Sequence, residues 1–286
     1  MDIPADWPHR DSSRFIACRP HRWHVQIMGD GPTLLLLHGA GGASHSWRDV
    51  APLLAQTYQV IIVDLPGQGF TKLGARQRCG LDTMAEDLKA LIDQEGWTPQ
   101  AIVGHSAGAA VAFRLAELGV SPRGQIIGIN AALSNFEGVA GFLFPMVAKL
   151  LSLNPFTARI FTATSGNRAS VKRLIEGTGS HLSEDGLAQY QTLISMPSHV
   201  DATLAMMAQW KLDGLLSRLP RITQDTLLIV GDQDKAVPAG TSVEAAAKLP
   251  HARVEVMEGV GHLAHEERPD QTVDLIRAFL SEKRPD

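Results

Sequence analysis

The stretch AIVGHSAGAAVAFRLAEL, residues 101–118, decides the fold of this 286-residue chain. Its apolar start, Ala101 to Val103, predicts a short strand, and the run Ala109 to Leu118 predicts a helix. Between them, Gly104-His105-Ser106-Ala107-Gly108 matches Gly-x-Ser-x-Gly, a pattern typical of a tight turn that projects a nucleophilic serine above a sheet. An isolated match indicates only a turn. The strand and helix on the correct sides favour a nucleophile at Ser106, where the helix N-terminus favours developing negative charge.

A serine nucleophile needs a base, and the base needs an acid that orients it, because a neutral hydroxyl is a poor nucleophile. Two carboxylates, Asp232 and Asp234, follow one predicted strand, and two histidines, His262 and His265, follow the next. Serine, then acid, then histidine is the chain order found in α/β-hydrolases. Both aspartates also suit a turn at the end of a strand, so the residue types alone leave the acid open.

The resemblance to α/β-hydrolases breaks this tie. In that fold the pattern Gly-x-x-Asp-x-x-x-Pro, here residues 231–238, carries the acid at Asp234, and a Gly-His pair carries the base, here His262. Asp232 then stabilises its turn locally. For His265 we expect a structural role, bonded to its own loop or to Glu266.

The segment His38-Gly39-Ala40-Gly41-Gly42 follows another predicted strand and is a candidate oxyanion hole. Two backbone N–H groups are needed where the substrate oxygen becomes negative, and we assign them to Ala40 and Ala107. The alternative is a glycine-rich turn. A phosphate loop is excluded because no Gly-Lys-Ser/Thr follows. We interpret a second turn, Asp64 to Gly69, as structural.

The remaining pattern alternates strands with helices. Short apolar runs predict strands at Thr33–Leu37, Val60–Val63, Ala101–Val103, Gln125–Ile129, Thr226–Val230 and Arg253–Met257. Helical patterns lie between several of them, at Trp47–Gln56, Leu81–Gln94, Gly108–Leu118, Val243–Leu249 and Gln271–Ser281. Such alternation predicts an α/β protein with a mostly parallel sheet flanked by helices, and together with the order of serine, acid and histidine it resembles the α/β-hydrolase fold.

One further strand looks different. Arg22 to Ile27 alternate, with Trp23, Val25 and Ile27 on one side, which predicts an antiparallel strand with one solvated face. We therefore expect His24, on the other side, to face solvent.

The alternation of strands and helices stops between the predicted strand that ends near Ile129 and the one that begins near Thr226. This interval has helical periodicity but no convincing strand. Active-site lids are a common use of such insertions. We predict a core domain of residues 1–131 and 215–286 and an inserted helical cap, or lid, of residues 132–214.

Apolar residues crowd the predicted cap, and we expect Phe142, Phe144, Met146 and Trp210 to contact a flat, apolar substrate. The alternative is that these side chains close the cap onto the core. Trp210 lies at helical spacing from Met206, which is more typical of core than of ligand contacts.

Composition excludes several classes of function. The formal net charge of −4 and the pI near 6.3, without a run of lysines or arginines, exclude nonspecific nucleic-acid binding. Two cysteines, Cys18 and Cys79, predict a cytoplasmic setting, and residues 1–15 lack the features of a signal peptide. The most apolar window, Gly141 to Phe156, is shorter than the about 20 residues that span a bilayer, so we expect no membrane span, although it could touch a membrane surface. No metal-ligand spacing is present, and we expect no cofactor.

Six segments resemble the BchO family, magnesium-chelatase accessory proteins of bacteriochlorophyll biosynthesis in phototrophic bacteria. The segments are His38–Gly42, Asp64–Thr71, Gly104–Ala110, Asn130–Leu133, Phe136–Gly141 and Asp201–Trp210. The resemblance covers nearly the whole chain, including the predicted cap. Gln68 stands where most α/β-hydrolases have histidine in Gly-His-Gly, a departure that this family shares. The resemblance implies an association with magnesium chelatase, at the step that puts Mg²⁺ into protoporphyrin IX, but it supplies no reaction.

Two hypotheses follow. In the first, the chain is a serine hydrolase that cleaves an ester or related bond of an apolar substrate, such as a tetrapyrrole, with Ser106, Asp234 and His262 as its triad. In the second, it is a noncatalytic accessory or chaperone protein that binds porphyrin through the cap and presents it to magnesium chelatase. An intact triad favours the first hypothesis, since a pure binder has no physical need of all three groups.

Overall fold

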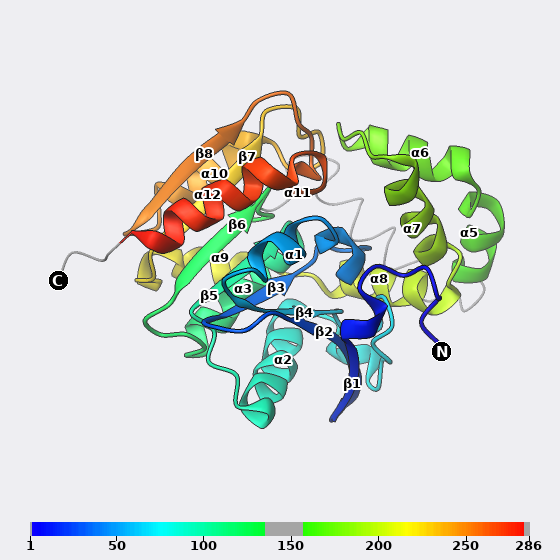
Figure 1. Cartoon of the computed structure of the whole chain (residues 1–286), viewed down its shortest axis with the longest axis horizontal. Coiled ribbons are helices and arrows are strands. Elements are labelled where there is room, and N and C mark those ends of the chain that lie inside the picture. Colours follow the sequence, from blue (N-terminus) through cyan, green and yellow to red (C-terminus); the bar gives the residue numbers. More distant parts are fainter. Residues whose placement is uncertain (1, 135–156, 283–286) are drawn as a thin grey trace.

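The computed structural model describes residues 2–134 and 157–282, which form one eight-stranded sheet with helices on both faces (Figure 1). The strands are β1 (Ser13–Cys18), β2 (His21–Met28), β3 (Thr33–Leu37), β4 (Gln59–Val63), β5 (Ala101–His105), β6 (Gln125–Ile129), β7 (Thr226–Gly231) and β8 (Ala252–Met257). They lie in the order β1-β2-β4-β3-β5-β6-β7-β8. The pairs β1–β2 and β2–β4 are antiparallel and the other pairs are parallel, so the predicted, mostly parallel sheet is confirmed.

The helices follow the predicted alternation. In the described residues they are α1 (Val50–Leu54), α2 (Leu81–Glu95), α3 (Ala107–Glu117), α5 (Thr157–Ser165), α6 (Arg168–Gly177), α7 (Glu184–Ile194), α8 (Pro197–Gln209), α9 (Asp213–Arg218), α10 (Ala239–Ala246), α11 (Ala264–Glu267) and α12 (Pro269–Ser281). Short 3-10 helices are η1 (Arg10–Ser12), η2 (Ser44–Trp47), η3 (Arg76–Arg78) and η4 (Leu219–Arg221). The helix predicted over Trp47–Gln56 is shorter than expected, because η2 precedes α1 and ends at Trp47.

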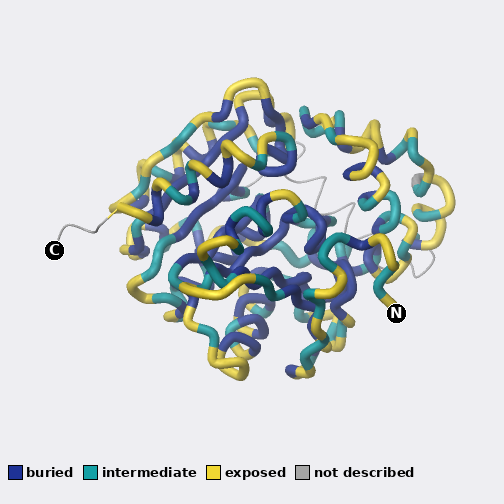
Figure 2. The backbone as a smooth tube through the Cα atoms, viewed as in Figure 1, coloured by how far each residue is buried: buried dark blue, intermediate teal, exposed yellow. Residues whose placement is uncertain are grey.

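Each face of the sheet carries its own apolar core. Leu35 and Leu37 of β3 belong to one buried cluster, and Leu34 and Leu36 belong to the other. Successive side chains of a strand point to opposite faces, so a run of apolar residues fits a strand that is covered on both sides. Figure 2 shows the central strands buried and the exposed residues on the outer helices and loops.

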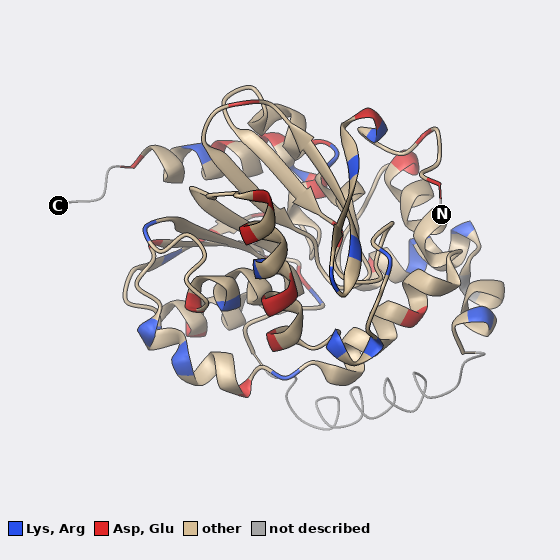
Figure 3. Ribbon diagram, turned by 90° about the horizontal axis from the view of Figure 1, so that it is seen from below, with Lys and Arg blue, Asp and Glu red and all other residues tan. Residues whose placement is uncertain are grey.

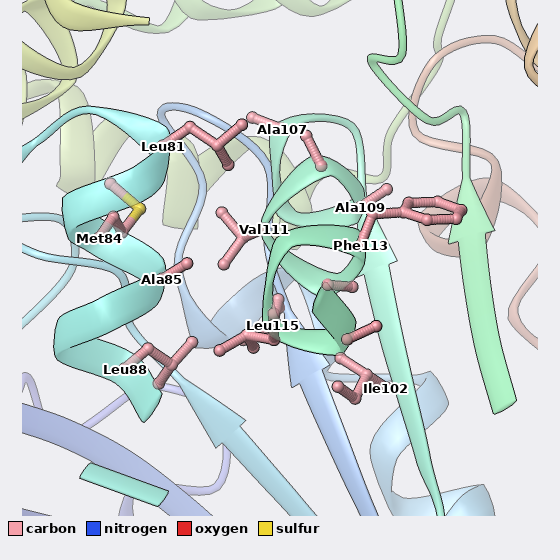
Figure 4. Packing of buried hydrophobic residues seen from close by; sticks show 14 of the residues in the cluster. Leu81, Met84, Ala85, Leu88, Ile102, Ala107, Ala109, Val111, Phe113 and Leu115 are labelled. Atoms are coloured by element: carbon pink, nitrogen blue, oxygen red, sulfur yellow. The ribbon is translucent and has the colours of Figure 1, made fainter. Parts of the chain in front are cut away.

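Helix α3, which carries the residue after Ser106, is buried between the sheet and α2. Its alanines allow a close approach to the strands, while Val111 and Leu115 face Leu81, Met84 and Leu88 of α2 (Figure 4). Full burial of one such leucine stabilises the fold by about 1.5–3 kcal/mol. The packing therefore fixes the helix whose N-terminus the nucleophile occupies.

The prediction that β2 has a solvated face, with His24 in solvent, is wrong. The side chains of His24 and Gln26 are both fully buried. Gln26 donates through Nε2 to the carbonyl of Pro8 at 2.7 Å, and His24 Nδ1 lies 2.6 Å from Asp64 Oδ2. The reason is tertiary: the N-terminal residues before β1 and the turn after β4 fold over this face of β2.

Of the helices between β6 and β7, α5, α6, α7 and α8 gather at one side of the sheet, whereas α9 lies near α3 (Figure 1). In the described residues of this insertion, from residue 157 to β7, there are five α-helices, the 3-10 helix η4 and no strand. Leu215 of α9 belongs to the same core cluster as α2 and α3. The division at residues 132 and 214 into core and cap stays a prediction.

Charged residues of both signs are interspersed over the elements in the view of Figure 3. None of the helices within residues 2–134 and 157–282 has the length and apolar character that a membrane span requires.

Candidate active site

Ser106 lies at the turn between β5 and α3. Its φ of 52° and ψ of −117° place it in a sparsely populated backbone region, which costs of the order of 1–3 kcal/mol and persists only where the surroundings enforce it. The Ser106 N–H donates to the carbonyl of Ile129 at the end of β6, at 2.9 Å. A Cβ on Gly104 would lie 2.4 Å from the carbonyl oxygen of Gly108, so the turn is too tight for side chains at its flanks.

Asp234 and His262 meet at the carboxyl ends of β7 and β8. His262 Nδ1 and Asp234 Oδ2 are 2.7 Å apart, and the Asp234 carboxylate is fully buried. The other carboxylate oxygen, Oδ1, accepts the backbone N–H groups of Ala236 and Val237, both at 2.8 Å. An ionised carboxylate that accepts these bonds holds the imidazole with its proton on Nδ1 and leaves Nε2 free to accept a proton.

Asn130, which the sequence reasoning did not assign to the site, completes the shell of this acid. It follows β6 with a φ of 47°, a left-handed conformation that asparagine tolerates better than most residues. Its Nδ2 donates to Asp234 Oδ2 at 2.6 Å. One sequence signal could have identified Asn130 as a site residue: it is polar and directly follows an apolar strand. That strand, β6, lies next to β5, which carries the serine turn.

The competing carboxylate, Asp232, lies away from the histidine. Its Oδ1 accepts the N–H of Gly259 at 2.7 Å, in the turn after β8. This contact fits the local stabilising role expected for it.

His105 connects the serine turn to the histidine loop. Its Nε2 lies 2.8 Å from the carbonyl oxygen of His262, and the two rings are 4.8 Å apart between centroids. Burial lowers the pKa of His105 well below its usual value, so the ring is neutral and Nε2–H is the donor. The residue next to Ser106 is thus bonded to His262. In the described residues the Ser106 hydroxyl itself makes no hydrogen bond to His262, which is common for catalytic pairs without a ligand.

His265 is buried, but the prediction that it bonds to its own loop or to Glu266 is wrong. Among the described residues neither of its ring nitrogens has a partner, and burial lowers its pKa to about 3. Glu266 instead accepts the hydroxyl of Tyr190 at 2.7 Å and pairs with Arg48. The His265 ring packs 4.6 Å from that of His105, so it supports the site by ring contact.

The candidate oxyanion loop packs directly against the serine. A Cβ on Gly39 would lie 2.8 Å from His105 Nδ1 and 3.0 Å from Ser106 Cβ. Within residues 2–134 and 157–282, the N–H groups of Ala40 and Ala107 have no hydrogen-bond acceptor. Ala107 is the first residue of α3, where an N–H group has no partner within the helix and meets the positive end of the helix dipole.

His38 fixes the peptide that carries the Ala40 N–H. Its Nδ1 donates to the carbonyl of Gly39 at 2.7 Å, and its Nε2 accepts the N–H of Leu65 at 2.9 Å. Gly42 N–H donates to the same Gly39 carbonyl at 3.0 Å. Since this carbonyl and the Ala40 N–H point in opposite directions from one planar peptide, both bonds set the direction of the N–H.

A segment between α6 and α7 holds the acid and base loops together, and sequence reasoning missed it. The carbonyl of Thr178 accepts the N–H of Lys235 at 3.1 Å and that of His262 at 3.4 Å. Ser180 Oγ accepts the N–H of Leu263 at 2.8 Å. These contacts join residues that are far apart in the chain, so no local sequence pattern predicts them.

The predicted substrate contacts are only partly visible. Phe142, Phe144 and Met146 lie outside the described residues. Trp210, at the end of α8, is partly buried and packs against the core cluster that includes α3. In the described residues no group of histidine, cysteine, aspartate and glutamate side chains could hold a metal ion.

Comparison with known proteins places this geometry in context. Residues 32–269 match the family model of the alpha/beta hydrolase fold. The chain is 46% identical over 280 residues to the magnesium-chelatase 30 kDa subunit of Rhodobacter capsulatus, covering 97% of this chain and 98% of that protein. It is 28% identical to 2-hydroxy-6-oxononadienedioate/2-hydroxy-6-oxononatrienedioate hydrolase 2 of Pseudomonas putida, covering 96% of this chain and 98% of that protein.

Solved structures show the same fold. 2-Hydroxy-6-oxo-6-phenylhexa-2,4-dienoate hydrolase from Rhodococcus sp. strain RHA1 superposes with a TM-score of 0.77 at 22% identity, covering 94% of this chain and 98% of that chain. Epoxide hydrolase CorEH superposes with a TM-score of 0.79 at 21% identity, with the same coverage of both chains.

Proposed function

The chain belongs to the BchO family of α/β-hydrolase-fold proteins, and from this premise we propose that it is a serine hydrolase with Ser106, His262 and Asp234 as its catalytic triad. Its substrate in this proposal is an apolar ester or a related compound used with the magnesium-chelatase step of bacteriochlorophyll biosynthesis. The observation that carries the proposal is the buried 2.7 Å contact between His262 Nδ1 and Asp234 Oδ2. The loop of His262 is bonded to His105, the neighbour of Ser106 on its strained turn, and an imidazole paired with a carboxylate is the group that activates a serine hydroxyl.

The reaction begins when Ser106 Oγ attacks the substrate carbonyl carbon while His262 Nε2 takes the hydroxyl proton. The carbonyl π electrons move to the oxygen, and the N–H groups of Ala40 and Ala107 stabilise that oxyanion. The tetrahedral intermediate collapses, His262 returns the proton to the leaving alkoxide, and an alcohol departs from the acyl-enzyme. Water then attacks the acyl carbon while His262 takes one of its protons, and the second tetrahedral intermediate collapses as the bond to Ser106 Oγ breaks and His262 returns that proton to Oγ, which releases the carboxylic acid and regenerates Ser106. Asp234 stays ionised throughout and stabilises the imidazolium.

The polar environment supports the direction of these proton transfers. Asp234 is held by two backbone N–H groups and the amide of Asn130, so its carboxylate keeps one orientation toward His262. His105 is neutral beside the site, so it adds no positive charge that would oppose protonation of His262.

The experiment that tests the proposal is labelling with a fluorophosphonate, which reacts with activated serines. The intact chain should gain one covalent label, and Ser106→Ala should gain none. Mass spectrometry of the intact protein counts the added labels, the comparison with Ser106→Ala assigns the label to Ser106, and thermal unfolding checks that the variant is folded. An unlabelled intact chain, or equal labelling of Ser106→Ala, would refute the assignment of the nucleophile.

A second function, noncatalytic binding of a porphyrin as an accessory or chaperone protein for magnesium chelatase, is favoured by the name of the Rhodobacter capsulatus relative. It predicts saturable binding of protoporphyrin IX to the folded chain whether or not Ser106 is present. Fluorescence titration of the intact chain and of Ser106→Ala measures this. Binding without labelling would favour the accessory role over the hydrolase.

A further inference from the structure

Gly41, the neighbour of the proposed oxyanion donor Ala40, is held from two sides by side chains. Its N–H donates to Gln68 Oε1 at 2.7 Å, and its carbonyl oxygen lies 3.2 Å from His199 Nε2. Gln68 belongs to the turn after β4, and His199 belongs to α8 of the insertion. A loop residue with both backbone groups bonded to side chains from elsewhere has its conformation set by tertiary contacts.

The two hydrogen-bond partners of His199, Gly69 and Gly41, determine which of its ring nitrogens carries the proton. Its Nδ1 accepts the N–H of Gly69 at 3.0 Å, so the ring proton is on Nε2 and donates to the Gly41 carbonyl. Only 2% of this histidine is exposed, and burial lowers its pKa to about 4. The ring is therefore neutral near pH 7, and one tautomer serves both bonds.

Gln68 is held in a matching way. Its amide nitrogen donates to the sulfur of Met206 on α8 at 3.1 Å, which directs the amide oxygen toward Gly41. The turn that carries Gln68 is fixed by Asp64, whose carboxylate accepts the N–H groups of Ser44 at 2.6 Å and of Phe70 at 2.9 Å. Gln68 has no exposed surface, so its amide has no solvent alternative.

These contacts reach Ala40 through the backbone. The peptide before Ala40 is fixed by the bonds to the Gly39 carbonyl, and the peptide after it contains the Gly41 N–H. With both flanking peptides held, the Ala40 N–H cannot turn without breaking a buried hydrogen bond. Oxyanion stabilisation depends on donors that are oriented before the charge develops.

We propose that Gln68 and His199 are positioning residues that orient the Ala40 N–H and make the oxyanion hole depend on the docking of α8. The inference rests on the proposed function, in which this N–H is an oxyanion donor. It assigns to one helix of the insertion a part in the rate of the chemical step.

Two substitutions of His199 separate its two bonds. The side-chain oxygen of His199→Asn reaches the place of Nδ1 and can accept from Gly69, but the side chain is too short to donate to Gly41. The longer amide of His199→Gln reaches the place of Nε2 and can donate to Gly41. Hydrolysis of a p-nitrophenyl ester, with kcat and KM measured separately, is the assay.

Removal of one oxyanion donor lowers kcat by about 10²–10³-fold. In His199→Asn the donor is still present but misdirected, so we expect a smaller loss of kcat, of at least about tenfold. We expect KM to stay within about twofold, since the bond acts in the transition state, and His199→Gln to recover most of the kcat. Val200→Ala is the matched control, because Val200 is buried on the same helix and makes no hydrogen bond to the loop. Equal losses of kcat in the two His199 variants, or a loss in Val200→Ala as large as in His199→Asn, would overturn the proposal.

A measurement without substrate separates this proposal from the proposed function. Amide hydrogen exchange of Gly41, followed by NMR in the full chain, should be about tenfold faster or more in Gln68→Leu and in His199→Asn than in Val200→Ala. Unchanged exchange at Gly41 in both variants, with Ser106 labelled by fluorophosphonate in the intact chain, would refute the positioning role and leave the hydrolase standing. Faster exchange with an unlabelled Ser106 would refute the hydrolase and support the coupling of α8 to the loop.

Discussion

Replacement of Asp234 by asparagine is the sharpest test of the proposed acid. Four donors surround this carboxylate: two backbone N–H groups at Oδ1, and Asn130 Nδ2 and His262 Nδ1 at Oδ2. An asparagine keeps its oxygen for the two backbone N–H groups, so its NH₂ group must face Asn130 and His262. Donor then meets donor at both places.

The size of the effect follows from this geometry. To relieve the clash, His262 must carry its proton on Nε2, and that tautomer cannot accept the proton of Ser106. In enzymes with this arrangement the same change lowers kcat by about 10⁴-fold, which corresponds to about 5 kcal/mol of transition-state stabilisation. A lost charge-assisted bond and an unsatisfied buried donor should also lower the free energy of unfolding by about 1–3 kcal/mol.

The assay is the steady-state kcat for a p-nitrophenyl ester, with thermal unfolding to establish the folded fraction. Asp232→Asn is the matched control, because Asp232 Oδ1 accepts the N–H of Gly259 and an asparagine oxygen can accept the same bond. We expect Asp232→Asn to keep kcat within about twofold. A damaging Asp232→Asn with a harmless Asp234→Asn would show that the acid assignment is wrong, and so would a loss in Asp234→Asn that only follows the unfolded fraction.

Three further substitutions test the surroundings of the site. Gly179→Ala should lower both kcat and the melting temperature, because Gly179 has a φ of 87° and a Cβ there would lie 2.0 Å from the carbonyl oxygen of Gln233. Gly177→Ala is the control, because its Cβ would meet nothing within 4 Å, and it should keep both values or raise the melting temperature. Asn130→Leu removes a donor to the acid and should lower kcat by about tenfold with KM unchanged, and unchanged kinetics would exclude a positioning role. Burial opposes ionisation of Asp64, but the electrostatic attraction of His24, the hydrogen bond from His24, the attraction of His38 and the N–H of Phe70 together lower its pKa from an ordinary 3.8 to about 2. This carboxylate therefore contributes about 2 kcal/mol of stability that is present above pH 3.8 and is lost as the pH falls toward about 2. Urea unfolding should show this acid dependence in the intact chain and not in Asp64→Asn.

The amino-acid sequence was enough to predict the alternation of strands and helices, the mostly parallel sheet and the polar residues that follow its strands, but it predicted neither β1 nor the order of the strands. Strand–turn–helix signals are local: an apolar run and two glycines around Ser106 specify both the strand and the sharp turn after it. The carboxyl ends of parallel strands meet at one edge, so residues that follow strands, such as Asp234 and His262, come together once the strands are ordered. Resemblance, not periodicity, separated Asp234 from Asp232.

The surroundings of these residues depend on how the elements pack in three dimensions. The burial of His24, the amide of Asn130 on the acid, the Thr178 carbonyl between the two loops and the contact of His199 with Gly41 all join segments remote in the chain. A buried polar group must find a partner, but the sequence does not say which one, because its identity depends on how the elements pack. The sequence therefore determines which chemical groups stand at the end of each strand, and packing determines how they are oriented and which further side chains hold them.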